Sequence, residues 1–77
     1  MPTPALGRNV LYCLNNGQNR GQERAARICR IWSDTCVNLR VDLDGENDVP
    51  NADWVTSVNE NAGVEPVPGM WRWPPKV

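Results

Sequence analysis

Tryptophan and arginine are the residues of this 77-residue chain best suited to bind a ligand, because it contains four Trp but no Phe and no His. An indole offers a flat surface for stacking, and a guanidinium can form paired hydrogen bonds with a phosphate or carboxylate. Both residue types are enriched at binding hot spots. The candidate ligand- or partner-binding side chains are Trp32, Trp71, Trp73, Arg8, Arg27, Arg40 and Arg72.

Some of the tryptophans must instead form the core, since no Phe is present to fill it. Trp71 and Trp73 are two residues apart, so on one strand they share a face. We expect Trp54 and one member of this pair to be buried. The remaining indoles would form a stacking platform or an interface.

The absence of His argues against an enzyme, because Ser-His-Asp and Cys-His arrangements lack their central residue. Cys13, Cys29 and Cys36 show no C-x-x-C spacing, and a buried structural thiol is the ordinary role of such residues. We therefore expect no catalytic residues, no metal and no cofactor.

An acidic run follows the clearest apolar alternation of the chain and comprises Asp42, Asp44, Glu46, Asp48 and Asp53. A calcium loop of the EF-hand type requires Gly at its sixth position between two helices, whereas Gly45 is fourth here and a strand precedes it. The sequence predicts a solvated hairpin tip whose short side chains cap backbone groups.

Five segments have the period-two or β-branched and aromatic character of strands. An alternative for the second segment is a helical start. Long polar loops separate the segments, and Asn16-Gly17 and Asp44-Gly45 are turn signals. The sequence predicts an all-β fold, a small five-stranded barrel or rolled sheet of SH3-like or OB-like type. The predicted strands cover residues 8–14, 24–32, 36–43, 53–58 and 70–73.

The length allows one domain, residues 1–77, with a flexible N-terminus at 1–6 and a C-terminal tail at 74–77. So small a core usually gives too little stability unless disulfides, a metal, a partner or self-association add to it. An odd number of Cys argues against a secreted disulfide scaffold. We expect a homo-oligomer. No apolar run is long enough to span a bilayer, so we expect a soluble protein without membrane contact.

Charge is unevenly distributed along the chain. Residues 1–40 carry six Arg against two acids, and residues 41–77 carry seven acids against Arg72 and Lys76, which gives +4 and −5. The two halves could pair across a sheet or an interface, or the arginines could line a surface for an anionic ligand. A third possibility is single-stranded nucleic-acid binding through an OB-like face, but a pI near 5.2 makes nucleic acid an unlikely partner.

Six short patterns follow one another along nearly the whole chain outside the loop at 15–23: Gly7-Arg8-x-Val10-x-Tyr12, Trp32-x-Asp34-Thr35, Val37-Asn38-Leu39-x-Val41, Asp44-Gly45-x-Asn47-Asp48, Trp54-x-Thr56-Ser57-Val58 and Pro68-Gly69-x-Trp71-x-Trp73-Pro74. Together they resemble a group of small uncharacterised bacteriophage and prophage proteins. The resemblance implies a phage origin and a compact β fold, and no known activity. Leu11 and Arg72 stand where that family often has His.

These observations predict a non-enzymatic phage accessory protein, a small oligomeric binding module in the host cytoplasm. Its partner would be a host protein or a small anionic ligand such as a nucleotide, with a role in countering host defence. The alternative is a virion structural protein, either a capsid decoration or a tail component.

Overall fold

The protein is an all-β domain, as predicted. The computed structural model describes residues 3–44, 48, 53–63 and 65–75. It contains five strands, in agreement with the five predicted segments to within two residues at each end. No helix occurs among these residues, so the second segment is a strand from its start. The strands are β1 (Asn9–Cys13), β2 (Glu23–Ile31), β3 (Cys36–Val41), β4 (Trp54–Asn59) and β5 (Trp71–Arg72).

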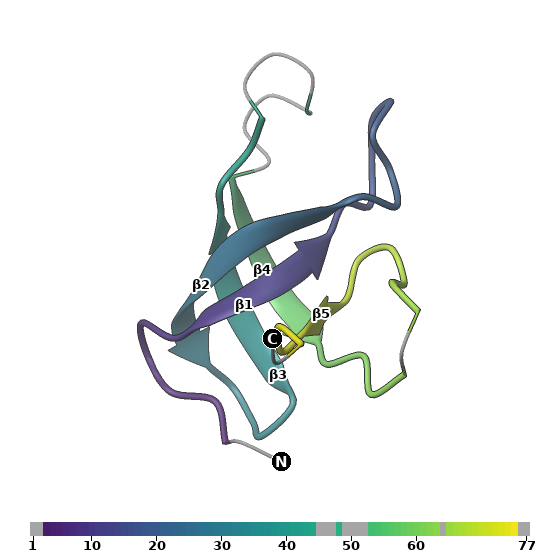
Figure 1. The fold of residues 1–77 in the computed structure, drawn as a ribbon. Coiled ribbons are helices and arrows are strands. Elements are labelled where there is room, and N and C mark those ends of the chain that lie inside the picture. Colours follow the sequence, from purple (N-terminus) through teal and green to yellow (C-terminus); the bar gives the residue numbers. More distant parts are fainter. Residues whose placement is uncertain (1–2, 45–47, 49–52, 64, 76–77) are drawn as a thin grey trace.

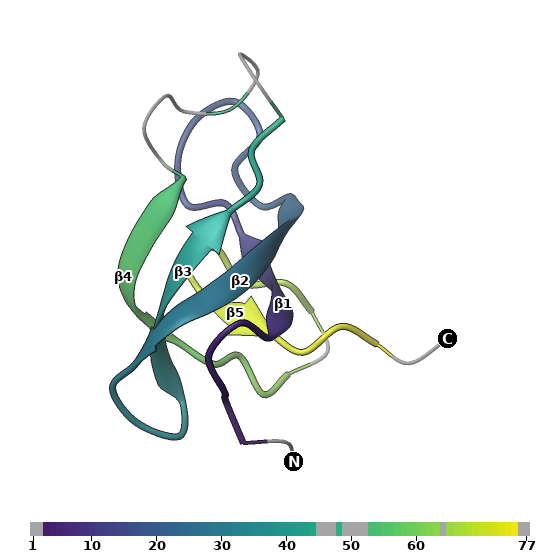
Figure 2. The same cartoon turned by 90° about the vertical axis from the view of Figure 1, so that its left-hand side faces the viewer.

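A single antiparallel sheet with the order β4-β3-β2-β1-β5 contains all five strands (Figure 1). Its two edge strands approach each other at one end, where Glu60 and Trp71 form an isolated parallel bridge. The amide of Asn61 donates to the carbonyl oxygen of Trp71 at 2.7 Å. The sheet is therefore curled into a half-barrel, which Figure 2 shows from the side of β4.

The inner face of the half-barrel holds the core, because alternate residues of β1, β2 and β3 point inward. Trp71 is the largest fully buried side chain. Its indole Nε1 donates to the carbonyl oxygens of Thr35 and Val58, both at 3.1 Å, so its polar atom is satisfied inside the protein. The buried core consists of Val10, Tyr12, Leu14, Ala26, Ile28, Val37, Leu39, Val41, Val58 and Trp71.

Two irregularities in strand register flank Asn38 of β3. On the β2 side, Leu39 pairs with Ile28 but Asn38 pairs with Arg30, so Cys29 is an extra residue. On the β4 side, two residues lie between the partners of Val37 and Leu39, and the second of them, Ser57, has a φ of 56°. Each bulge reverses which residues of its strand face outward beyond that point.

The β1–β2 loop and the start of the β3–β4 connection lie at one end of the sheet, and the β2–β3 turn lies at the other (Figures 1 and 2). The predicted turn at Asp44-Gly45 falls partly outside the described residues, as do Glu46 and the chain ends at 1–2 and 76–77. At the N-terminus, Pro4 is buried and the carbonyl of Ala5 accepts from the amide of Arg8 at 3.2 Å.

Candidate functional site

The outer face of β2, β3 and β4 carries a cross-strand row of two arginines and a tryptophan. Arg27 is the direct partner of Arg40, and Arg40 is the direct partner of Trp54. All three residues are exposed, and Trp54 retains 49% of its accessible surface. We call Arg27, Arg40 and Trp54 the first row. Two candidate residues that are 13 positions apart in the sequence thus lie side by side in the sheet.

The electrostatics of the first row favour an anion. Like charges directly opposite each other on neighbouring strands destabilise a sheet. Arg40 approaches a carboxylate oxygen of Asp53 at 3.7 Å, but both side chains are more than half exposed. Such surface pairs contribute little free energy and are easily exchanged. The guanidinium groups of Arg27 and Arg40 therefore remain able to bind an external anion together.

A second row lies beside the first on the same face and consists of Arg30, Asn38 and Trp32. The Arg30 guanidinium lies 4.0 Å from the centroid of the Trp32 ring. The Trp32 Nε1 donates to Asn38 Oδ1 at 2.8 Å, which fixes the edge of the indole. Trp32 is still 51% exposed, so the indole is held in place while much of its surface faces solvent.

Hydrogen bonds to Asn38 also connect the second row to the bulge of β4. Its Oδ1 accepts from the hydroxyl of Thr56 and from the amide of Ser57, both at 2.9 Å. Asn38 itself is buried although its position in β3 faces outward. A residue such as Ser57 in the left-handed region costs of order 1–3 kcal/mol, and bulges often re-aim side chains at functional sites.

The two bulges explain why the prediction for Trp54 was wrong. Simple alternation places Trp54 on the same face as Val58, which is buried. The extra residue at Thr56–Ser57 reverses that relation, so Val55 points inward and Trp54 points outward. The bulge at Cys29 likewise moves Arg30 to the outer face, away from the inward side of Ala26 and Ile28. Arg30 was not among the predicted site residues.

The C-terminal tryptophans, Trp71 and Trp73, belong to neither row. Trp71 has no exposed surface, so it belongs to the core, as expected for one member of the pair, and cannot serve as the ligand-binding platform predicted for it. Trp73 is half-buried and meets Trp71 edge to face at a centroid distance of 5.4 Å. Its buried Nε1 finds no acceptor among the described residues. The Arg8 guanidinium lies 5.7 Å from the Trp73 centroid, so Arg8 contacts this pair and not the first row.

Arg72 is held in an ion pair that crosses the outer face of β1. It lies opposite Leu11 and reaches Glu23 of β2, to which it donates two hydrogen bonds at 2.6 and 2.7 Å. Cys13 of β1, the direct partner of Glu23, is buried beside this pair. Burial raises the pKa of the Cys13 thiol, as does Glu23, while Arg20 and Arg72 act in the opposite direction. Cys13 is thus a structural thiol, and Arg72 is committed to Glu23.

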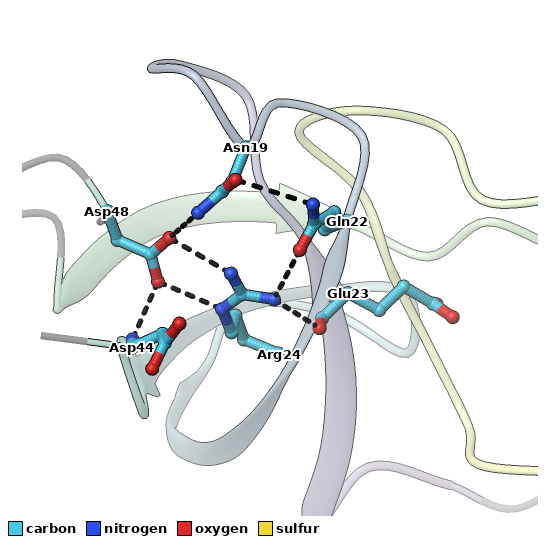
Figure 3. Close-up of polar contacts among 6 residues, drawn as sticks. All are labelled: Asn19, Gln22, Glu23, Arg24, Asp44 and Asp48. Carbon is cyan, nitrogen blue, oxygen red and sulfur yellow. Dashed lines mark hydrogen bonds and ion pairs between the residues drawn. The ribbon is translucent and has the colours of Figure 1, made fainter.

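Asp48 of the acidic run is buried and does not lie at a solvated tip, contrary to the prediction. It accepts two hydrogen bonds from Arg24, at 2.9 and 3.0 Å, one from Asn19 at 3.0 Å and one from the amide of Asp44 at 2.7 Å (Figure 3). The hydrogen bonds from Arg24, followed by those from Asn19 and Asp44, hold the pKa of Asp48 well below its usual range. This cluster links the β1–β2 loop to the β3–β4 connection.

The cysteines differ in exposure, since Cys13 is buried, Cys36 is intermediate and Cys29 is exposed. The prediction of a buried thiol is therefore wrong for Cys29, because this residue follows the inward-facing Ile28 and points outward, as Arg27 does. Within residues 3–44, 48, 53–63 and 65–75, no three Cys, Asp or Glu side chains are grouped so that they could hold a metal ion.

Neither family models, nor curated proteins, nor solved structures match this chain. In the part of the chain that the structure describes, no helix is long and apolar enough to cross a membrane. The site must therefore be interpreted from its own geometry.

Proposed function

We propose that this protein is a non-enzymatic binding module that captures a small anionic ligand, a nucleotide, on the outer face of β2, β3 and β4. The observation that carries the proposal is the direct cross-strand pairing of Arg27 with Arg40 on an exposed surface. A phosphate between the two guanidinium groups would replace their repulsion with charge-assisted hydrogen bonds.

Trp54 supports a nucleotide over a simple anion. It is the next residue along the same row and keeps about half of its surface exposed, 49%. A base stacked on this indole would place its phosphate beside Arg40, and base stacking on an aromatic side chain is favourable for any base. The pair of arginines would thus determine the charge of the ligand, and the indole would favour a planar group.

Titration of purified protein with a panel of nucleoside mono-, di- and triphosphates, followed by calorimetry and Trp fluorescence, tests the proposal. Arg27→Gln and Arg40→Gln should each weaken binding roughly tenfold, because a hydrogen bond to a charged group contributes about 1.5–3 kcal/mol. Arg20→Gln is the matched control, since Arg20 is exposed in the β1–β2 loop, away from the row.

Trp54→Ala should weaken nucleotide binding by a similar factor while leaving binding of inorganic phosphate unchanged. The proposal is wrong if no nucleotide gives heat or quenching, or if Arg20→Gln weakens binding as much as Arg27→Gln does.

A further inference from the structure

The second row repeats the chemistry of the first. The first row offers one indole, Trp54, beside Arg40 and Arg27, and the second row offers one indole, Trp32, beside Arg30. Both indoles are about half exposed, at 49% and 51%. A mononucleotide would occupy only one of these two similar subsites.

The spacing of the rows suits a continuous strand of nucleotides. Arg40 and Asn38 mark the two rows on β3 and are two residues apart, which corresponds to about 7 Å along a strand. Successive nucleotides of an extended single strand can match this spacing. Because the bases of a single strand are unpaired, each can stack on a separate side chain.

The second row is also pre-organised for stacking. Asn38 holds the edge of the Trp32 indole through Nε1, and Arg30 lies against its face at 4.0 Å. The Arg30 guanidinium plane is itself a surface on which a base can stack. An aromatic group that is already ordered loses less conformational entropy when a ligand binds.

The net charge of −1 belongs to the whole chain, and the outer face of β2, β3 and β4 has a different balance of charges. Glu23 and Asp48 accept hydrogen bonds from Arg72 and Arg24, on other parts of the sheet. Among the residues that the structure describes, Arg27 and Arg30 form no ion pair, and Arg40 has only the exposed contact with Asp53.

From these observations we infer that the outer face binds a short single-stranded oligonucleotide, with one nucleotide on each row. The inference rests on the proposed function and extends it from a single nucleotide to a strand. It requires contributions from Arg30 and Trp32, which binding of a mononucleotide at the first row does not.

Fluorescence titration with thymidine monophosphate and with oligothymidylates of two, three and four nucleotides tests the inference, with oligouridylates as the RNA arm. We expect affinity to rise roughly tenfold or more from the mononucleotide to the dinucleotide, and then to level off. For the dinucleotide and longer strands, the slope of log K against log salt should approach about −1.4, since each neutralised phosphate contributes about −0.7 and each row holds one phosphate.

Arg30→Gln and Trp32→Ala should weaken binding of the oligonucleotides much more than binding of the mononucleotide, while Arg20→Gln should change neither. Equal affinity for mononucleotide and oligonucleotides, or no effect of Arg30→Gln on the latter, would overturn the inference and leave the proposed function standing. Failure of every nucleotide to bind would overturn both. Preference for the RNA or the DNA series would identify the source of the strand.

Discussion

The arginines of this protein occupy two contrasting environments. Arg24 and Arg72 each donate two hydrogen bonds to a carboxylate, on Asp48 and Glu23 respectively, and both pairs are largely withdrawn from solvent. Arg27 and Arg40 instead face each other on an open surface. The pairs of Arg24 and Arg72 therefore hold distant segments of the fold together, whereas Arg27 and Arg40 lack a comparable partner in the described part of the chain.

The tryptophans divide in the same way. Trp71 is completely buried and donates its Nε1 to two carbonyl oxygens, while Trp54 and Trp32 are about half exposed, at 49% and 51%. The polar atom of Trp71 is thus satisfied inside the protein. The outer face of β2, β3 and β4 presents Trp54 and Trp32 to solvent.

The test with the largest expected effect compares the buried Trp71 with the half-exposed Trp54. Trp71→Ala should lower the free energy of unfolding by about 3–5 kcal/mol, because it removes a large core side chain and leaves a cavity. Trp54→Ala should lower it by only about 1 kcal/mol, since about half of the Trp54 surface stays exposed and no closed cavity is left. Denaturant unfolding followed by circular dichroism measures both. Similar losses for the two variants would show that Trp54 also supports the core.

A second test concerns Asn38, which connects the outer face to the fold. Asn38→Ala should cost about 1–3 kcal/mol, because donors on Trp32, Thr56 and Ser57 lose their common acceptor and three hydrogen bonds are removed. The Trp32 indole should also become more mobile, which time-resolved fluorescence anisotropy can detect in a variant that retains Trp32 alone among the exposed tryptophans. Asn59→Ala, at an exposed position of β4, is the control. An unchanged anisotropy would show that Arg30 suffices to hold the ring.

A third test uses the pH dependence of stability. The pKa of Asp48 is lowered in the folded protein, so its stabilising contribution is fully present above the pKa of the unfolded chain, about 4. That contribution is lost progressively as the pH falls from there toward the folded pKa. Asp48→Asn should therefore be less stable than the wild type at neutral pH, and the difference should shrink on acidification. An equal dependence of stability on pH in the wild type and in Asp48→Asn would contradict the contrast.

The smallest expected effect is an increase in stability, whereas the preceding variants are expected to lose stability. Arg27→Gln removes a like-charge pair from the outer face and should raise the stability by a few tenths of a kcal/mol at low salt. The gain should disappear at about 1 M salt, where charges are screened within roughly 3 Å. The same variant should lose affinity for nucleotides. A loss of stability in Arg27→Gln would mean that Arg27 has a structural role.

Much of the fold could be predicted because alternation is a local property. Val37, Leu39 and Val41 alternate with polar residues and are buried in β3, and each of the other predicted strands is present. The prediction that Trp54 is buried was wrong because the alternation of β4 is interrupted. Trp54 and Arg30 lie beyond bulges, and nothing in the local pattern signals that one extra residue will be inserted there.

The candidate site was predicted in part for the same reason. Arg27 and Arg40 lie on one exposed face, as the hypothesis of an arginine-lined surface requires. Trp71 is buried, Arg72 is paired with Glu23, and Arg8 lies over Trp73. Which arginines meet a carboxylate depends on contacts between distant segments, such as the 49 residues that separate Arg72 from Glu23.

From the sequence alone follow the fold class, a small all-β protein, and a composition rich in indole and guanidinium groups but without imidazole. Composition and period-two patterning carry that information because they act through the preferences of single residues and short segments. Only the tertiary structure decided which face displays that chemistry. Strand register and the two bulges beside Asn38 are set by packing across the sheet, and a shift of one residue exchanges the inner and outer faces.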